Sequence, residues 1–159
     1  VKQIRVLVRV QLDGMLAGIR ATGRTGELAY STDTVPPRSA SDYFHQNCWM
    51  GVSQPGLADV AARHEIGIDR FMWGSDYPHN EGTGPFTREH LRQVMVDVPE
   101  NEIRSMLADN AARLYGFDLA ALAPLAEQHG PTVDEIATPL TELPENPNET
   151  LLRVAAGSR

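Results

Sequence analysis

The chain has 159 residues, of which 42% are hydrophobic and 22% are charged, and its formal net charge is −7. This composition is ordinary for a globular domain, and the acidic balance argues against a nucleic-acid-binding surface, which is normally basic. No apolar run approaches the roughly 18 residues that a membrane span requires, and the single cysteine, Cys48, excludes an internal disulfide. We therefore expect a cytoplasmic protein that binds neither nucleic acid nor membrane.

The first 41 residues divide into three patterns. Residues 1–10 are rich in β-branched side chains, which is typical of a strand, and we treat them as a divergent N-terminal segment. Apolar side chains then recur at helical spacing, and Gly23 fits just past the end of that helix. Residues 31–41 contain two consecutive prolines and are predicted to form a loop. The helical stripe, which we interpret as core, consists of Leu12, Met15, Leu16 and Ile19.

Two apolar segments follow, with a helical pattern between them. Residues 44–52 are predicted to form a strand, and a short helix then runs from Leu57 to a natural stop at Gly67. Residues 71–73 return as a strand that is buried on both faces, because their apolar character does not alternate. Strand, helix and strand with short links predict a βαβ unit with parallel strands. The fold class is therefore α/β.

Helices are also predicted after the polar loop at residues 80–86. Thr87 is expected to cap the first helix, and Pro99 begins a second one, which Gly116 ends. Residues 118–126 favour a further helix, whereas residues 130–159 carry four prolines and little periodicity. We therefore predict a partly disordered C-terminal extension over residues 118–159, with one short helical patch at residues 133–137.

The most informative segment reads Trp73-Gly74-Ser75-Asp76-Tyr77-Pro78-His79. Here the strand ends and is followed by an aspartate, and α/β barrels keep their chemistry at the carboxyl ends of their strands. Asp76 is thus a candidate metal ligand or general base, the alternative being an aspartate that caps its own turn. His79 is a second catalytic candidate that could orient Asp76, contact substrate or transfer a proton. The alternative for His79 is a loop histidine bonded to the backbone.

This segment resembles the last barrel strand of the amidohydrolase-related metal-dependent enzymes, in the branch that includes aminocarboxymuconate-semialdehyde decarboxylase. Residues 42–49 resemble the preceding strand with its lead-in, and residues 108–116 resemble the closing helix of that family. The resemblance covers residues 11–117. It implies the C-terminal part of a metal-dependent (β/α)8 TIM barrel, namely the last two strands and their flanking helices.

The resemblance also implies roles for particular residues. Asp76 would bind a divalent metal, with zinc as the first expectation, and would take a proton from the attacking water. His79 would be a second catalytic residue in the same loop. Asn47 and Trp49, on the strand before, would line the substrate cavity, although packing is the default role for side chains inside a barrel.

The histidines of this chain depart from the family pattern. Family members take further metal ligands from a His-x-His pair on the first strand, and a complete barrel needs about 250 residues. The resemblance therefore implies a metal-dependent hydrolase acting on a carbonyl-type small molecule, present here as a partial chain. The alternatives are a non-oxidative decarboxylase of the same family, or a noncatalytic remnant that pairs with a complementary barrel portion or with its own copy. The histidines, none in a His-x-His pair, are His45, His64, His79, His90 and His129.

Overall fold

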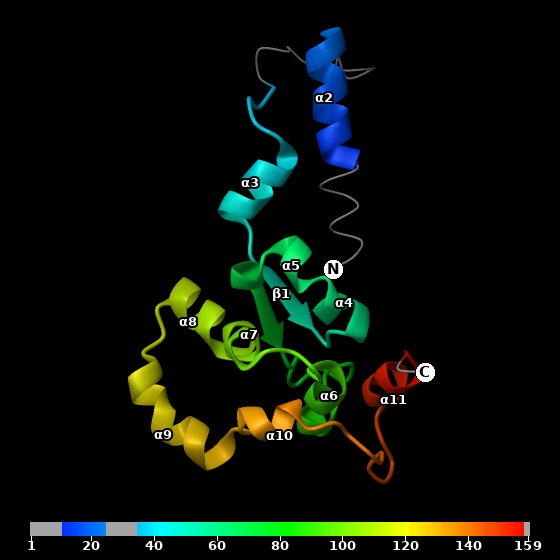
Figure 1. The fold of residues 1–159 in the computed structure, drawn as a ribbon, viewed down its shortest axis with the longest axis vertical. Coiled ribbons are helices and arrows are strands. Elements are labelled where there is room, and N and C mark those ends of the chain that lie inside the picture. The colour runs from blue at the N-terminus through cyan, green and yellow to red at the C-terminus, as the bar shows by residue number, and fades with distance from the viewer. Residues whose placement is uncertain (1–10, 25–34, 158–159) are drawn as a thin grey trace. The chain divides into compact units, whose positions relative to one another are not determined.

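The computed structural model describes residues 11–24 and 35–157. The chain forms two compact units, Val1–Trp49 and Met50–Arg159. Figure 1 shows the elements of both units along the chain. The strand predicted within residues 1–10 lies outside the described residues.

The first unit contains helix α2 (Asp13–Thr22), which confirms the predicted amphipathic helix. Gly23 ends α2 in the left-handed conformation, with a φ of 64°, as its position predicted. The interpretation of the apolar stripe as core is wrong for the described residues, because no residue of α2 is buried. Leu12, Met15 and Leu16 instead line a pocket of about 450 Å³ within this unit.

The second described helix of this unit, α3 (Ala40–Asn47), corrects the predicted strand at residues 44–52. The hydroxyl of Ser39 accepts the backbone N–H of Asp42 at 3.0 Å, and the Asp42 carboxylate accepts the N–H of Ser39 at 3.1 Å. This capping box satisfies two donors at the start of a helix. The helical hydrogen bonds that it initiates continue to Asn47, so the strand begins only at Met50.

Two strands, β1 (Met50–Ser53) and β2 (Phe71–Gly74), form a parallel sheet in the second unit. This confirms the predicted parallel arrangement and agrees with a partial α/β fold. The register pairs Met50 with Phe71 and Ser53 with Gly74, so both carboxyl ends lie at the same edge. The connection consists of α4 (Leu57–Ala61), α5 (Arg63–Ile66) and the 3₁₀ turn η4 (Ile68–Arg70).

Helical segments make up most of the chain after β2. Thr87 is the first residue of its helix and not the predicted cap, a position that Phe86 occupies. Residues 133–137 are helical as predicted, whereas the last helix was not predicted. The segments are α6 (Thr87–Val94), α7 (Glu100–Arg104), the π-helical η5 (Ser105–Asp109), α8 (Asn110–Tyr115), α9 (Leu119–His129), α10 (Val133–Ala137) and α11 (Glu149–Gly157).

The core of the second unit gathers around β2. Phe71 and Met95 are fully buried, and Ile103 and Met106 are nearly so. Strand β2 packs against η5 and α8, while α6 packs against α10 and α11. These contacts fix the loop between β2 and α6, which carries Asp76, on a rigid base.

Candidate functional site

Asp76 lies at the carboxyl edge of the parallel sheet, two residues beyond β2. Its side chain is exposed, and Oδ2 accepts a long hydrogen bond of 3.5 Å from Nε2 of Gln54. Among the described residues this is the only hydrogen bond to the Asp76 carboxylate, so the carboxylate does not cap its own turn. Gln54 directly follows β1, so the contact joins the ends of the two neighbouring strands.

Both of these residues have left-handed backbone conformations, with a φ of 54° at Gln54 and 60° at Asp76. A non-glycine residue in this region costs roughly 1 kcal/mol, and such outliers gather at functional sites. Asp76 is predicted from its sequence context, whereas Gln54 is not. The signal that could have found it is its place, because in parallel strands the residue after β1 lies at the same edge as the residues after β2.

The loop after β2 folds closely around Asp76. The carbonyl of Asp76 accepts the N–H of His79 at 2.7 Å, and the carbonyl of His79 accepts the N–H of Gly82 at 2.9 Å. The N–H of Thr83 then returns to the carbonyl of Ser75 at 3.0 Å. These bonds explain Gly82, since a Cβ there would lie only 2.8 Å from the Ser75 carbonyl oxygen.

Helix α11 and the residue before it fasten this loop from the far end of the chain. The hydroxyl of Thr150, which is nearly buried, donates to the carbonyl of Glu81 at 2.9 Å. Nδ2 of Asn148 donates to the carbonyl of Gly84 at 3.1 Å, while its Oδ1 accepts the N–H of Leu151 at 2.9 Å. The C-terminal extension therefore belongs to the structure around Asp76.

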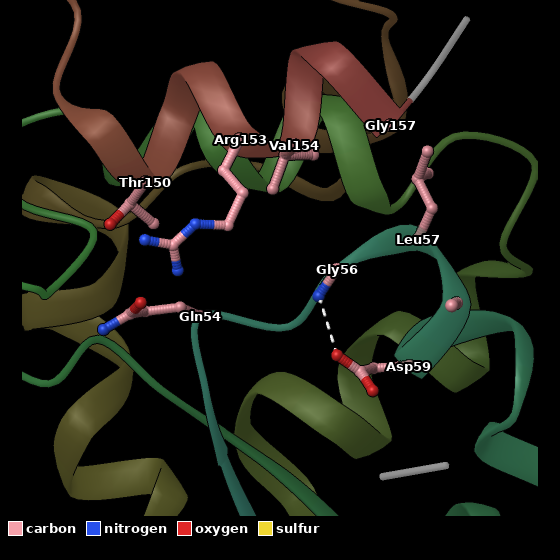
Figure 2. A pocket seen from close by; sticks show the side chains of 9 residues that line it. Gln54, Gly56, Leu57, Asp59, Thr150, Arg153, Val154 and Gly157 are labelled. Carbon is pink, nitrogen blue, oxygen red and sulfur yellow. Dashed lines mark hydrogen bonds between the residues drawn. The ribbon is translucent and has the colours of Figure 1, made fainter.

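A pocket of about 390 Å³ lies between the end of β1 and α11. Figure 2 shows the Arg153 guanidinium directed into it, between Gln54 and Thr150. The carboxylate of Asp59 accepts the N–H of Gly56 at 3.0 Å at the other side of the pocket. Gln54 thus lines this pocket and contacts Asp76, which joins the pocket to the candidate carboxylate.

His79 occupies the turn beside Asp76, with an exposed side chain. Its Nδ1 accepts the backbone N–H of Glu81 at 3.3 Å. This bond is the one expected of a loop histidine, and it leaves Nε2 as the ring nitrogen that could meet a ligand. The structure therefore brings His79 close to Asp76 through the backbone, and a catalytic role for it stays a prediction.

The two predicted substrate contacts belong to the first unit. Asn47 is the last residue of α3, and its Nδ2 donates to the carbonyl of Tyr43 at 2.9 Å. Trp49 lies between α3 and β1, on the amino-terminal side of the strand, and is half-buried. Neither residue is part of a strand, so the reason for expecting them inside a barrel does not hold, and their role stays a prediction.

A divalent metal can be tested against these side chains. Catalytic zinc sites generally take about three protein ligands, and Asp76 with His79 offers one carboxylate and one imidazole. Across residues 11–24 and 35–157, no group of three or more His, Cys, Asp or Glu side chains is arranged to hold a metal. The described residues therefore do not make a complete metal site by themselves.

A parallel strand pair joined by helices, with a carboxylate at its carboxyl edge, is the arrangement of α/β enzymes. Residues 41–117 match a family model described as Amidohydrolase. This segment is therefore similar to an amidohydrolase-related family, a metal-dependent hydrolase-type superfamily whose members typically bind divalent metals. No match to the chain was found among curated proteins or among solved structures. Within the described ranges, no helix is both long and apolar enough to cross a membrane.

Proposed function

We propose that this chain supplies the last two strands and the ligand aspartate of a metal-dependent hydrolase that acts on a small carbonyl compound in the cytoplasm. The observation that carries the proposal is the exposed Asp76 carboxylate at the carboxyl end of β2, within the segment that matches the family. The metal, zinc in this proposal, supplies Lewis acidity when it is bound.

The residues of this chain would have different roles in the reaction at the carboxyl edge of the sheet. Asp76 takes a proton from the water that attacks the substrate carbonyl. Gln54 holds Oδ2 of that carboxylate, which leaves Oδ1 for the proton or for a cation. His79 contacts the substrate or the leaving group through Nε2, while Asn47 and Trp49 line the substrate cavity. A decarboxylase would use the same residues to stabilise developing charge.

The remaining ligands would come from a complementary barrel portion. The sheet formed by the described residues has two strands, and each strand has one edge that pairs with no other described strand. Both strands therefore present edges that can pair with further strands of a (β/α)8 barrel, in the same polypeptide, in a second copy or in another chain. The incomplete ligand set favours one second candidate, a noncatalytic partner-dependent half.

The test is to isolate the native species that contains this chain from its source cells, measure its mass and determine its zinc content. The proposal predicts a species well above the 17.5 kDa of this chain, with near-stoichiometric zinc. Asp76→Asn should remove most of the zinc, because it replaces a charged ligand by a neutral amide. Glu81→Gln, in the same exposed loop, is the matched control and should keep the metal.

A zinc-free species at 17.5 kDa would overturn the proposal and favour the noncatalytic half. A heavier species that keeps its zinc in the Asp76→Asn variant would overturn the role of Asp76. Hydrolysis and decarboxylation are then separated by whether carbon dioxide is released from the substrate.

A further inference from the structure

The pocket between β1 and α11 is lined by a cationic side chain that has no role in the proposed function. Arg153 points its guanidinium into this space, between Gln54 and Thr150. Of the described side chains that line the pocket, Arg153 is the only cation and Asp59 the only acid. The Asp59 carboxylate already accepts the N–H of Gly56 at 3.0 Å, so Arg153 is the group available to recognise a ligand.

The ion pair that Arg153 makes can be exchanged. Its Nη2 lies 3.3 Å from Oε1 of Glu149, one helical turn earlier, and the two side chains are 67% and 90% exposed. Such an exposed pair contributes little, because water and salt screen it. A ligand carboxylate that accepts two parallel N–H groups of the guanidinium makes a stronger contact.

The surrounding frame is fixed, which a binding site requires. Thr150, one turn from Arg153, is nearly buried and bonded to the carbonyl of Glu81 at 2.9 Å. Asn148 caps the start of α11 and bonds to the loop that follows Asp76. Gln54 lines the pocket and also contacts Asp76 at 3.5 Å, so one side chain links the pocket to the candidate carboxylate.

We propose that this pocket is a subsite for a carboxylate group of the substrate, with Arg153 as its cation. A single negative charge fits better than a phosphate dianion, because the carboxylates of Asp59 and Asp76 lie nearby and repel added charge. The proposed function would then act on a substrate that carries a carboxylate besides the reacting carbonyl. The link to catalysis rests on the proposed function, whereas the binding itself does not.

Binding can be measured without activity by NMR titration of the ¹⁵N-labelled chain. The probe is propionate, with propionamide as its neutral isostere, and the reporters are the backbone amide of Gly56 and the side-chain amide of Gln54. Propionate should give saturable shifts at both reporters, and propionamide should give none. Arg153→Gln should weaken binding by about tenfold or more, the range expected for a charged hydrogen-bonded contact.

Arg104→Gln is the matched control. Arg104 makes the same kind of exposed pair with Glu100, at 2.7 Å and one helical turn apart, but does not line this pocket. Its variant should bind propionate like the unmodified chain. Shifts that do not saturate, equal shifts with propionamide, or unchanged binding by Arg153→Gln would overturn the subsite. Tighter binding of inorganic phosphate at the same reporters would overturn the choice of a carboxylate.

The Asp76→Asn variant separates the two proposals. It should bind propionate at least as well as the unmodified chain, since a nearby negative charge is removed. Saturable binding in a chain whose native form lacks zinc would mean that the proposed function fails while the subsite stands. If the zinc content depends on Asp76 but propionate does not bind, the proposed function stands and the subsite fails.

Discussion

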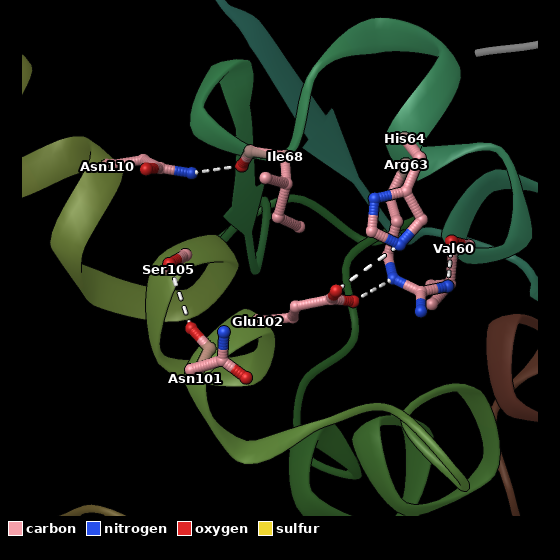
Figure 3. A network of polar contacts seen from close by, with 8 residues as sticks. All are labelled: Val60, Arg63, His64, Ile68, Asn101, Glu102, Ser105 and Asn110. Carbon is pink, nitrogen blue, oxygen red and sulfur yellow. Dashed lines mark hydrogen bonds and ion pairs between the residues drawn. The ribbon is translucent and has the colours of Figure 1, made fainter.

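Asn110, at the start of α8, donates from its side-chain amide to the backbone carbonyl of Phe71, at the start of β2, over 2.7 Å. The same Nδ2 donates to the carbonyl of Ile68 at 2.7 Å, as Figure 3 shows, and Oδ1 accepts Nη2 of Arg113 at 2.9 Å. The Asn110 side chain is almost fully buried. One amide thus ties the closing helix to the strand that leads to Asp76.

Asn110→Asp should destabilise the chain by about 3 kcal/mol or more, because it removes both donated bonds and points a carboxylate at two carbonyl oxygens. Asn110→Ala should cost about 2 kcal/mol, since it leaves the carbonyls unpaired without adding a charge. Urea unfolding measures both. Asn101→Asp, an exposed position on α7, is the control and should change stability by about 0.5 kcal/mol or less. Equal losses at positions 110 and 101 would contradict the role of this bond.

The sequence predicts this part of the fold well because its signals are local. Residues 108–116 were predicted to form the closing helix, and the structure has the helical segments η5 and α8 there, which Asn110 and Arg113 bond to the carbonyls of Phe71 and Asp69. The parallel strands follow from two apolar segments with a helix between them. Gly23 and Gly116 end helices with φ values of 64° and 72°, which few other residues adopt readily.

The pocket could not be predicted from the sequence, because it depends on contacts between distant segments. Thr150 and Glu81 are 69 residues apart, and only the folded chain shows that α11 fastens the loop after β2. Arg153 has no pattern that sets it apart from other helix-surface arginines. The strand predicted at residues 44–52 is wrong for a different reason. The sequence contains the Ser39 and Asp42 capping box that begins α3, but the apolar residues after it also favour a strand.

Gly82→Ala should disturb the loop that carries Asp76. An added Cβ would lie 2.8 Å, 2.9 Å and 3.0 Å from the carbonyl oxygens of Ser75, His79 and Asp76, all backbone atoms that cannot move independently. We expect a loss of about 2 kcal/mol in the free energy of unfolding and altered amide shifts from Ser75 to Thr83. Gly84→Ala is the control, since nothing lies within 4 Å of a Cβ there. Native-like shifts in the Gly82→Ala variant would show that the loop is not closely packed.

The Arg63–Glu102 ion pair should contribute more to stability than a typical surface pair. Nε of Arg63 lies 2.6 Å from Oε2 of Glu102, both side chains are 16% exposed, and His64 approaches the same carboxylate (Figure 3). Glu102→Gln should therefore cost about 2 kcal/mol. Glu100→Gln removes the exposed pair with Arg104 and should cost about 0.5 kcal/mol. If both variants lose the same free energy of unfolding at low salt, partial burial adds nothing to the pair.

His90 makes stability depend on pH. Its side chain on α6 is 1% exposed, and neither ring nitrogen has a hydrogen-bond partner among the described residues. Burial lowers the pKa of His90 from 6.5 to about 4, because the charged imidazolium loses its hydration. The folded state therefore keeps His90 neutral over a pH range in which the unfolded state protonates it.

Between pH 6.5 and about 4 the unfolded state binds one proton more than the folded state at this residue, so stability falls as the pH is lowered through that range. The shift corresponds to a loss on the order of 3 kcal/mol. His90→Leu removes the titrating group and the two unpartnered nitrogens while keeping the site filled. Between pH 6.5 and 4, the slope of its free energy of unfolding against pH should be smaller by the amount that corresponds to about one bound proton. Urea unfolding at several pH values measures this slope. His45→Gln, at an exposed position on α3, should keep the pH dependence of the unmodified chain. If the His90→Leu and unmodified curves run parallel through this range, His90 is protonated equally in both states and the assignment is wrong.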